Sequence, residues 1–219
     1  MTTSPRFWVL DLDDTLYAER DYVRSALAYV GVYVEQRFGS QNFARMLLTL
    51  DAAGKSDPIA DAWKTCALPE TERETAILAM RAHSPNIKLS EGAHLILSRL
   101  RQNGRPYAIV TDGRSITQRA KIAALGCGDA RAISISEEMG ISKLDPDRFR
   151  AVADAFPPGH FCYVGDNPKK DFAAPKRIGW DTIMLDHRGE GIHSQDLPDD
   201  PAFHPSRIVG DLRDLLHDL

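Results

Sequence analysis

Short apolar runs that stop at polar residues alternate with helical patterns along most of the chain. The runs are rich in β-branched and aromatic side chains and lie between turn-forming residues, which is typical of buried strands. They cover residues 7–10, 107–110, 132–135, 161–164 and 182–185, with a shorter sixth run at residues 208–209. Strands that alternate with helices in this way predict a parallel α/β sheet.

Helical periodicity fills the gaps between these runs. A helix is expected over residues 90–102, where leucines recur and an Asn-Gly stop signal follows. Further helices are expected around residues 116–124, 149–153 and 212–216. The first of these three takes its periodicity from Ile116, Ala120, Ala123 and Ala124.

One segment breaks the alternation of strands and helices, since residues 19–84 contain no convincing strand. Apolar residues recur there at spacings of three and four, which predicts several helices separated by Gly, Ser and Pro. We therefore expect two domains. An α/β core is formed by residues 1–18 and 85–219, and an all-helical domain of residues 19–84 is inserted after the first strand.

Composition argues against several classes of protein. Charged residues make up 26% of the chain, and no run approaches the roughly 18 apolar residues that span a bilayer. The N-terminal segment meets acidic residues after four apolar ones, unlike a signal peptide. The net charge of -4, without a basic stripe, argues against a nucleic-acid binder. Cys66, Cys127 and Cys162 show no CxxC spacing, so we expect reduced thiols and a cytoplasmic protein.

Acidic and hydroxyl side chains directly follow three of the predicted strands. Residues 11–15 (DLDDT) follow the first strand, residues 111–113 (TDG) the second, and residues 165–171 (GDNPKKD) the fourth. Ligands of open parallel sheets bind at the carboxyl ends of the strands, so we expect these groups to converge. Crowded carboxylates repel one another unless a cation compensates them, and oxygen ligands suit Mg²⁺. Beside such an ion, one carboxylate can attack phosphorus and form an aspartyl-phosphate.

Four motifs stand in order along the predicted core. They are residues 11–17 (DLDDTLY), residues 109–113 (IVTDG), Lys143 within GISKLDP, and Gly165-Asp166 followed by Asp171. Together they resemble the motifs of the haloacid dehalogenase superfamily across residues 6 to about 190. The resemblance implies a Rossmann-like core, and residues 19–84 lie where the superfamily carries a helical cap.

The resemblance also implies catalytic roles. Asp11 is expected to be the nucleophile and a metal ligand, and Asp13 the general acid and base. Thr111 is expected to hydrogen-bond the transferring phosphoryl group. Lys143 is expected to hold Asp11 and to neutralise the charge that develops on the phosphoryl group. These roles agree with phosphoryl transfer, which depends on positioning and charge neutralisation.

The same resemblance implies the metal and phosphate ligands. Asp11 and Asp166 are expected to bind Mg²⁺ through their carboxylates, and Asp13 through its backbone carbonyl. Asp171 is expected to support the ion directly or through water. Besides the side chains of Thr111 and Lys143, the backbone N–H groups of Leu12, Asp112 and Gly113 are expected to contact the phosphate.

Two positions depart from the family pattern. Asp112 stands where an Asn is common, and we expect its side chain to point away from the phosphate or to contact the cap. Leu144 stands where a Pro is common after the motif lysine. Lys169 and Lys170 are the alternatives to Lys143, because they follow Asp166 closely.

Substrate recognition is assigned to the cap, where Arg24 and Lys64 are the basic candidates for contacts with the leaving group. The alternative is that both belong to a solvated helix face. A cap that closes over the site excludes water and favours a small substrate. His187 and His193 lie six residues apart with no cysteine nearby, so we expect surface histidines and no zinc site.

The sequence thus predicts a Mg²⁺-dependent phosphohydrolase that acts on a small phosphorylated metabolite, such as a sugar phosphate or a nucleoside monophosphate. Neither nucleic acid nor membrane is expected as a partner, and the sequence leaves the oligomeric state open. Three alternatives remain. A phosphomutase has the same core, a non-catalytic binding module would not need the acidic residues, and a dehalogenase would lack the carboxylate at Asp13.

Overall fold

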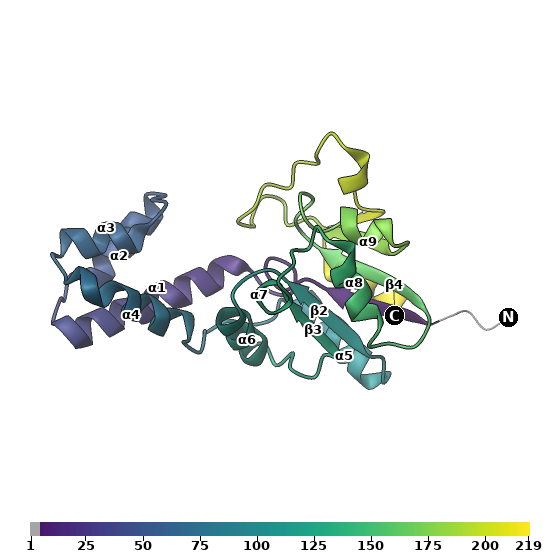
Figure 1. Ribbon diagram of the computed structural model, residues 1–219, viewed down its shortest axis with the longest axis horizontal. Helices are drawn as coiled ribbons and strands as arrows, with labels where there is room; N and C mark the ends of the chain where they lie inside the picture. The colour runs from purple at the N-terminus through teal and green to yellow at the C-terminus, as the bar shows by residue number, and fades with distance from the viewer. Residues whose placement is uncertain (1–4) are drawn as a thin grey trace. The chain divides into compact units, whose positions relative to one another are not determined.

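The computed structural model describes residues 5–219, and within them six strands form one parallel sheet (Figure 1). The strand order is β3-β2-β1-β4-β5-β6. The strands are β1 (Arg6–Leu10), β2 (Tyr107–Thr111), β3 (Ala132–Ile135), β4 (His160–Gly165), β5 (Asp181–Leu185) and β6 (Arg207–Val209). The predicted parallel α/β sheet is confirmed, and each expected run forms a strand.

Strand β1 lies between β2 and β4, and the polar motifs follow the carboxyl ends of these three strands. It pairs in parallel with β2 on one side and with β4 on the other, so that Leu10 is level with both Ile109 and Val164. The pairing continues one residue further, because the backbone N–H of Asp11 donates to the carbonyl of Val164 at 2.8 Å. The residues that follow these three strands therefore leave the sheet side by side.

Helices of the core precede or follow these strands along the chain. They are α5 (Glu91–Gln102), α6 (Ser115–Ala124), α7 (Ser136–Met139), α8 (Pro146–Ala153) and α9 (Ala173–Arg177), with the 3₁₀ helices η1 (Pro201–Phe203) and η2 (Leu212–Asp218). Local sequence explains where two of these helices, α5 and α8, begin. The hydroxyl of Ser90 accepts the N–H of Ala93 at the start of α5, and Asp145 caps α8 just before Pro146.

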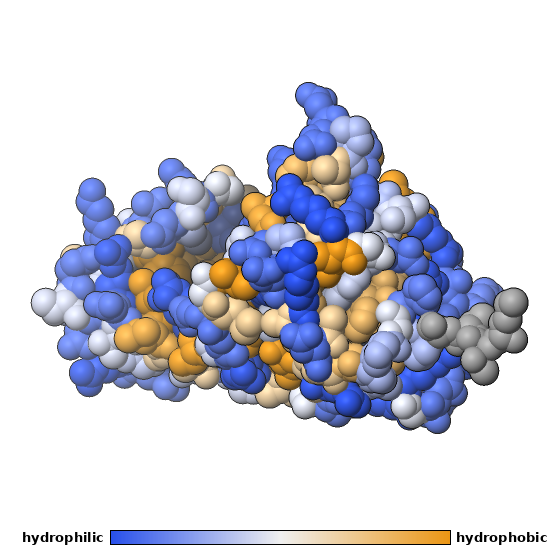
Figure 2. Space-filling model, turned by 45° about the vertical axis from the view of Figure 1, so that its right-hand side comes forward, coloured by the Kyte–Doolittle hydropathy of each residue, from blue (hydrophilic) through white to orange (hydrophobic). Residues whose placement is uncertain are grey.

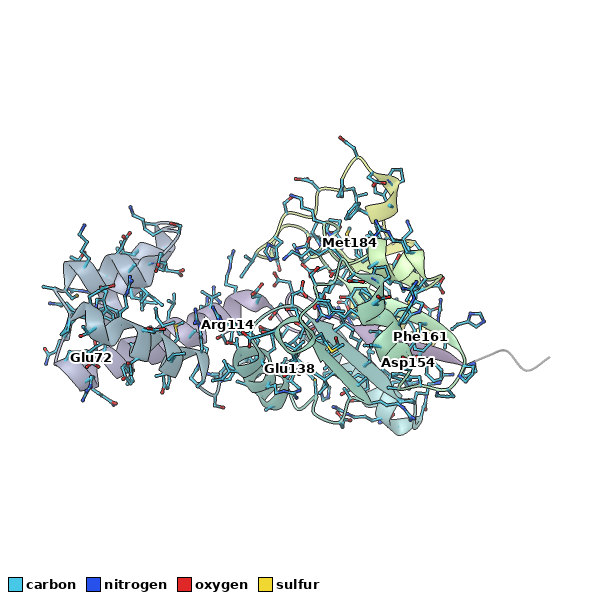
Figure 3. All side chains as sticks on the ribbon, viewed as in Figure 1. Glu72, Arg114, Glu138, Asp154, Phe161 and Met184 are labelled. Carbon is cyan, nitrogen blue, oxygen red and sulfur yellow. The ribbon has the colours of Figure 1, made fainter. Side chains whose placement is uncertain are left out.

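An aromatic core lies between the sheet and helices α8 and α9. Phe161 and Trp180 stack with ring centroids 4.6 Å apart, and Phe149 meets Trp180 edge-on at 5.5 Å. Phe161, on β4, and Met184, on β5, are labelled in Figure 3. This packing supports the strands that carry the acidic residues.

Helix α6 buries a different face from the one its apolar periodicity suggested. Ile116 is 47% exposed, and Ala123 and Ala124 are exposed as well. The buried residues of the helix are Gln118, Lys121 and Ile122. The expected apolar face was therefore wrong, because polar groups at the site bind Gln118 and Lys121.

The chain divides into two compact units, one of residues 5–20 and 88–219 and the other of Asp21–Ile87. The helices α1 (Glu19–Phe38), α2 (Phe43–Ala52), α3 (Pro58–Thr65) and α4 (Glu70–Arg81) occupy the inserted segment. Within it Trp63 is 1% exposed and meets Phe38 and Phe43 edge-on. The inserted unit thus has a hydrophobic core of its own.

The surface drawn in Figure 2 is mostly polar, with apolar side chains scattered between the polar ones. Exposed apolar residues of the inserted unit include Val32, Leu48 and Leu78. Such scattered residues are normal for protein surfaces. Among residues 5–219, no helix combines the length and the apolar character needed to cross a membrane.

Candidate active site

A polar pocket of about 100 Å³ opens at the carboxyl ends of the central strands. Its lining comes from the end of β2 and the loops that follow β1, β2 and β4. The first residue of α1, Lys143 from the loop between α7 and α8, and one histidine complete it. The lining residues are Asp11, Asp13, Asp14, Glu19, Thr111, Asp112, Lys143, Asp166, Asn167, Lys170, Asp171 and His193. The pocket thus brings together most of the residues expected at the site.

Asp11 and Lys143 form a buried ion pair. Nζ of Lys143 lies 2.6 Å from Oδ2 of Asp11, while Oδ1 of Asp11 accepts the N–H of Leu12 at 2.7 Å. Burial raises the pKa of Asp11 to about 8 even though Lys143 counteracts it. Burial alone lowers the pKa of Lys143, but the carboxylates of Asp11 and Asp171 outweigh it and hold that pKa well above its usual value.

Asp171 organises the loop that follows β4. Its Oδ1 accepts from Nζ of Lys143 at 3.0 Å, and its Oδ2 accepts the N–H groups of Asp166 and Asn167 at 3.1 and 2.8 Å. A Cβ at position 165 would lie 2.5 Å from Oδ2 of Asp171, which explains the glycine there. Asp171 therefore orients Asp166 through its backbone.

The carboxylates of Asp11, Asp166 and Asp171 fit a divalent cation. One oxygen from each lies within 4.8 Å of the others, and all three residues are buried. Oδ2 of Asp166 is buried without a hydrogen-bond partner among residues 5–219. Burial, together with the charges of Asp11 and Asp171, raises the pKa of Asp166 to about 9. A hard cation would relieve this repulsion and pair the orphaned oxygen.

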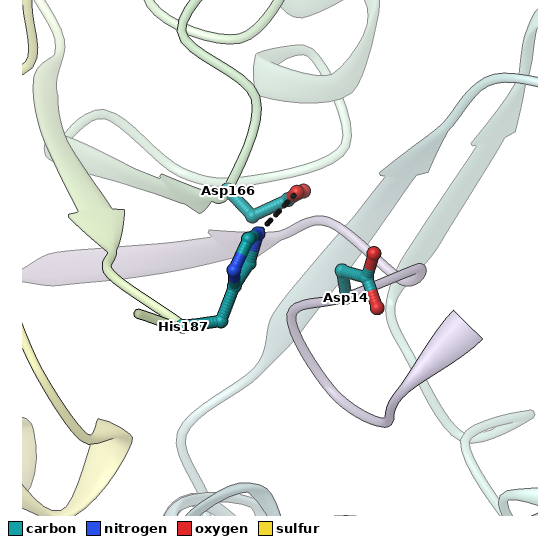
Figure 4. A group of neighbouring side chains, drawn as sticks. All are labelled: Asp14, Asp166 and His187. Atoms are coloured by element: carbon teal, nitrogen blue, oxygen red, sulfur yellow. Dashed lines mark ion pairs between the residues drawn. The ribbon is translucent and has the colours of Figure 1, made fainter. Parts of the chain in front are cut away.

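His187 faces the carboxylate of Asp166, and Asp14 lies nearby (Figure 4). Its Nε2 lies 3.7 Å from Oδ2 of Asp166, and its side chain is 11% exposed, so the expected surface position was wrong. Nδ1 accepts the N–H of Gly191 at 3.0 Å, which in a neutral ring places the proton on Nε2. Nε2 of His187 faces Oδ2 of Asp166 without a hydrogen bond between them, and ligand atoms of Asp14, Asp166 and His187 lie within 4.8 Å of one another. His193 is exposed but lines the pocket.

Asp14 joins two loops at the edge of the pocket. One of its oxygens accepts the N–H of Glu19 at 2.8 Å, and the other accepts the N–H of Ile192 at 2.7 Å. Glu19 was missed by the sequence analysis. Burial, followed by the nearby charge of Asp13, raises the pKa of Glu19 to about 7.

Asp13 is held by three side chains. Its Oδ1 accepts from Nζ of Lys121 at 2.8 Å and from the hydroxyl of Tyr17, and its Oδ2 accepts from Nε2 of Gln118 at 2.9 Å. The same amide nitrogen donates to Oγ1 of Thr111 at 2.6 Å. Gln118 and Lys121 were missed, although two polar residues three apart on a helix just after the second motif are a usable signal.

The unusual Asp112 is neutralised from within the core. It pairs with the guanidinium of Arg148, whose side chain is fully buried and also binds Ser134 and the carbonyl of Thr111. The N–H of Gly113 donates to the hydroxyl of Ser136 at 2.9 Å, and Gly113 does not line the pocket. The expected phosphate contact of Gly113 therefore does not match this geometry.

The remaining candidates differ in position. Lys143 is the lysine paired with Asp11, whereas Lys170 lines the pocket and Lys169 is exposed. Arg24 and Lys64 belong to the inserted unit. The side chain of Arg24 is 67% exposed and lies 3.4 Å from Asp21, and Lys64 is exposed on α3.

The structure is thus a Rossmann-like α/β fold whose central strand ends carry an acidic cluster that could hold a cation, beside the buried Lys143. The chain belongs to the haloacid dehalogenase-like hydrolase family, whose family model matches residues 8–179. The resemblance stated from the four motifs is thereby confirmed.

Two curated relatives are phosphatases by name. A phosphoserine phosphatase of Thermus thermophilus is 35% identical over 152 residues, which cover 67% of this chain and 57% of the relative. A glyceraldehyde 3-phosphate phosphatase of Pyrococcus furiosus is 34% identical over 97 residues, which cover 43% of this chain and 40% of the relative. The matches thus span between two fifths and three fifths of these relatives.

Solved structures share the fold over nearly the whole chain. The HAD-hydrolase YfnB from Bacillus subtilis has a TM-score of 0.66 at 19% identity and covers 99% of both chains. A β-phosphoglucomutase from Thermotoga maritima has a TM-score of 0.64 at 14% identity and covers 98% of both chains. At these identities the likeness shows the fold alone.

Proposed function

We propose that this protein is a Mg²⁺-dependent phosphatase that hydrolyses a small phosphorylated metabolite through an aspartyl-phosphate on Asp11. The observation that carries the proposal is the buried pair of Asp11 and Lys143 beside the orphaned carboxylate oxygen of Asp166. The names of the two phosphatase relatives support the reaction, and the magnesium bound in YfnB supports the choice of ion.

In the first half of the proposed reaction, the carboxylate of Asp11 attacks phosphorus and the ester P–O bond breaks. Asp13 gives a proton to the leaving oxygen. Thr111 donates its hydroxyl proton to a phosphoryl oxygen, because its Oγ1 already accepts from Gln118. Lys143 keeps Asp11 oriented and compensates charge on the transferring group.

In the second half, water attacks phosphorus, the bond to Asp11 breaks, and Asp13 takes the proton of the water. Asp11, Asp166 and the backbone carbonyl of Asp13 are the groups that would hold the ion, and Asp171 supports it by orienting Asp166. When bound, the ion supplies charge neutralisation for the phosphoryl group.

Residues 19–84 are proposed as a cap that selects the leaving group, with Arg24 and Lys64 as its basic contacts. A core that handles the phosphoryl group through Thr111 and Lys143 leaves recognition of the remaining substrate to other residues. A helical unit inserted between the first and second motifs is suited to this role. The cytoplasmic location stays a prediction.

Two other catalytic functions are separable from this one. A phosphomutase would return the phosphoryl group to an organic product, whereas a phosphatase releases inorganic phosphate. A dehalogenase needs no proton donor for its leaving halide, so the carboxylate of Asp13, held by three donors, favours phosphate esters.

The test is a panel of phosphorylated metabolites assayed for phosphate release with Mg²⁺ present. The panel includes phosphoserine, glyceraldehyde 3-phosphate, sugar phosphates, nucleoside monophosphates and p-nitrophenyl phosphate. We expect phosphate release from at least one member and none from the Asp11→Asn variant. Turnover by Asp11→Asn at the wild-type rate would reject Asp11 as the nucleophile. No release from any member would reject the phosphatase itself.

A further inference from the structure

Two side chains of helix α6, those of Gln118 and Lys121, donate hydrogen bonds to the carboxylate of Asp13. We propose that Gln118 and Lys121 are positioning residues that hold Asp13 so that its Oδ2 exchanges the proton with the leaving-group oxygen and with the attacking water. This inference rests on the proposed phosphatase function. It assigns a positioning role to two buried polar residues of α6 that lie outside the four motifs.

The hydrogen bonds distinguish the two oxygens of Asp13. A carboxylate oxygen accepts about two hydrogen bonds. Oδ1 receives both, one from Nζ of Lys121 at 2.8 Å and one from the hydroxyl of Tyr17. Within residues 5–219, Oδ2 receives one, from Nε2 of Gln118 at 2.9 Å. The side chain of Asp13 is 19% exposed and lines the pocket, so Oδ2 keeps the acceptor site for a proton.

Burial makes this arrangement rigid. Gln118 is 2% exposed and Lys121 is 3% exposed, although the buried face of a helix ordinarily carries apolar side chains. Burying an ammonium group is costly unless a well-placed partner compensates it, and Asp13 is such a partner. Hydrogen bonds in a site shielded from water are also stronger than at the surface. Asp13 therefore has little freedom to rotate.

Gln118 also links the two steps of phosphoryl handling. Its amide nitrogen bonds both Oδ2 of Asp13 and Oγ1 of Thr111, so the proton-transfer group and the phosphate-binding hydroxyl share one anchor. A Cβ at position 113 would lie 3.2 Å from the side chain of Gln118, and φ of Gly113 is +141°. Glycine in the second motif thus leaves room for the Gln118 side chain.

The two halves of the reaction depend differently on Asp13. Formation of the phosphoenzyme from p-nitrophenyl phosphate needs little acid assistance, because nitrophenolate is a good leaving group. Formation from phenyl phosphate needs more, and hydrolysis of the phosphoenzyme needs Asp13 as a base with either ester. Misplacing Asp13 should therefore slow hydrolysis and phenyl phosphate cleavage, but not the release of nitrophenolate in the first turnover.

The experiment compares Gln118→Leu, Lys121→Met and Tyr17→Phe with a matched control on the same helix. The control is Arg119→Met, since Arg119 pairs with Glu138 and its side chain is 54% exposed (Glu138 is labelled in Figure 3). Each variant is mixed with p-nitrophenyl phosphate in a rapid-quench instrument. The kcat ratio between phenyl and p-nitrophenyl phosphate is also measured. That ratio does not depend on the fraction of folded protein.

In the wild type and in Arg119→Met we expect the same kcat ratio and steady-state rate. In Gln118→Leu, Lys121→Met and Tyr17→Phe, a burst of nitrophenolate should approach one equivalent of active enzyme, followed by a steady state about 10²-fold slower. An unchanged kcat ratio and burst in both Gln118→Leu and Lys121→Met would overturn the inference, and turnover by the wild type would show that the proposed phosphatase function still stands. No turnover by the wild type would instead reject the proposed function.

Discussion

Nζ of Lys143 lies 2.6 Å from Oδ2 of Asp11 and 3.0 Å from Oδ1 of Asp171, and the three side chains are at most 6% exposed. One buried cation thus pairs with both the proposed nucleophile and the residue that orients Asp166. Charges buried at this depth are stable only as a compensated set, because each ion alone loses its hydration. The ion pairs of Lys143 therefore contribute both to the stability of the site and to its proposed chemistry.

Replacing Lys143 with Met should abolish measurable phosphatase activity and lower the free energy of unfolding by about 3–5 kcal/mol, because two carboxylates lose their cation. Urea unfolding monitored by circular dichroism gives the stability change. Lys169→Met is the control, since Lys169 is exposed and was one of the two alternatives to Lys143. An active Lys143→Met beside an inactive Lys169→Met would reverse the assignment.

Removal of divalent ions should also have two measurable effects. EDTA should abolish activity and Mg²⁺ should restore it, because the carboxylates of Asp11 and Asp166 repel each other in a buried site. Mg²⁺ should raise the Tm of the wild type, since a ligand that binds the folded state stabilises it by mass action. In Asp166→Asn the rise should vanish, while the Tm in EDTA should equal or exceed that of the wild type. Full activity in EDTA would contradict the metal site.

The strands follow from local pattern, and so a parallel α/β core could be predicted, whereas the order of the strands in the sheet could not. The runs that form β1, β2 and β4 are fully or mostly buried, and burial on both faces makes the whole run apolar. Helix α6 could not be predicted as well. Its buried face is set by hydrogen bonds to Asp13, in the loop after β1, and to Thr111, at the end of β2, and the periodicity of apolar residues does not report such partners.

The motif residues at the strand ends were also predictable from local sequence, because each motif lies within a short stretch of residues directly after a strand. His187 and Arg148 were not. His187 reaches Asp166 through a loop after β5, and Arg148 reaches Asp112 from α8, so both depend on contacts between distant segments. Isolated charged or imidazole side chains in a sequence are more often exposed, which is why the surface reading of His187 was wrong.

Arg148 offers a test of how Asp112 is accommodated. Arg148→Met should lower the free energy of unfolding by about 3–5 kcal/mol, because it leaves the Asp112 carboxylate and two backbone carbonyls without their donor. The Asp112→Asn and Arg148→Met changes should be non-additive in a double-mutant cycle followed by urea unfolding. Arg150→Met, on the same helix but 58% exposed, should stay within about 0.5 kcal/mol of the wild type. Additive changes would show that the pair is not coupled.

The cap proposal predicts a change in preference and not in chemistry. Arg24→Ala or Lys64→Ala should lower kcat/KM for the best metabolite of the panel more than kcat/KM for p-nitrophenyl phosphate. The proposed Mg²⁺ requirement should stay intact, because the proposed ion ligands lie in the core. The ratio of the two kcat/KM values is the measurement. If neither substitution changes that ratio, these two residues belong to a solvated helix face.

A pH-dependent contribution to stability comes from Asp129, away from the site. Its carboxylate accepts from Nε and Nη2 of Arg101 at 2.8 and 2.7 Å and from the hydroxyl of Tyr107 at 2.6 Å. The Arg101 bonds lower the pKa of Asp129 from 3.8 to about 2. The unfolded chain therefore binds a proton at a higher pH than the folded protein does.

The stabilisation by Asp129 is fully present above about pH 4 and is lost as the pH falls toward 2. Asp129 is 48% exposed, so solvent screening keeps the effect at or below about 1 kcal/mol. Asp129→Asn should be less stable than the wild type at neutral pH, and urea unfolding across a pH series should show the difference shrinking over that window. Asp154→Asn, an exposed carboxylate at the end of α8, serves as the control and should show no such trend. If the difference in the free energy of unfolding between the wild type and Asp129→Asn is instead the same at both ends of the window, ionisation of Asp129 does not cause it. The difference then comes from the loss of the hydrogen-bond geometry with Arg101 and Tyr107.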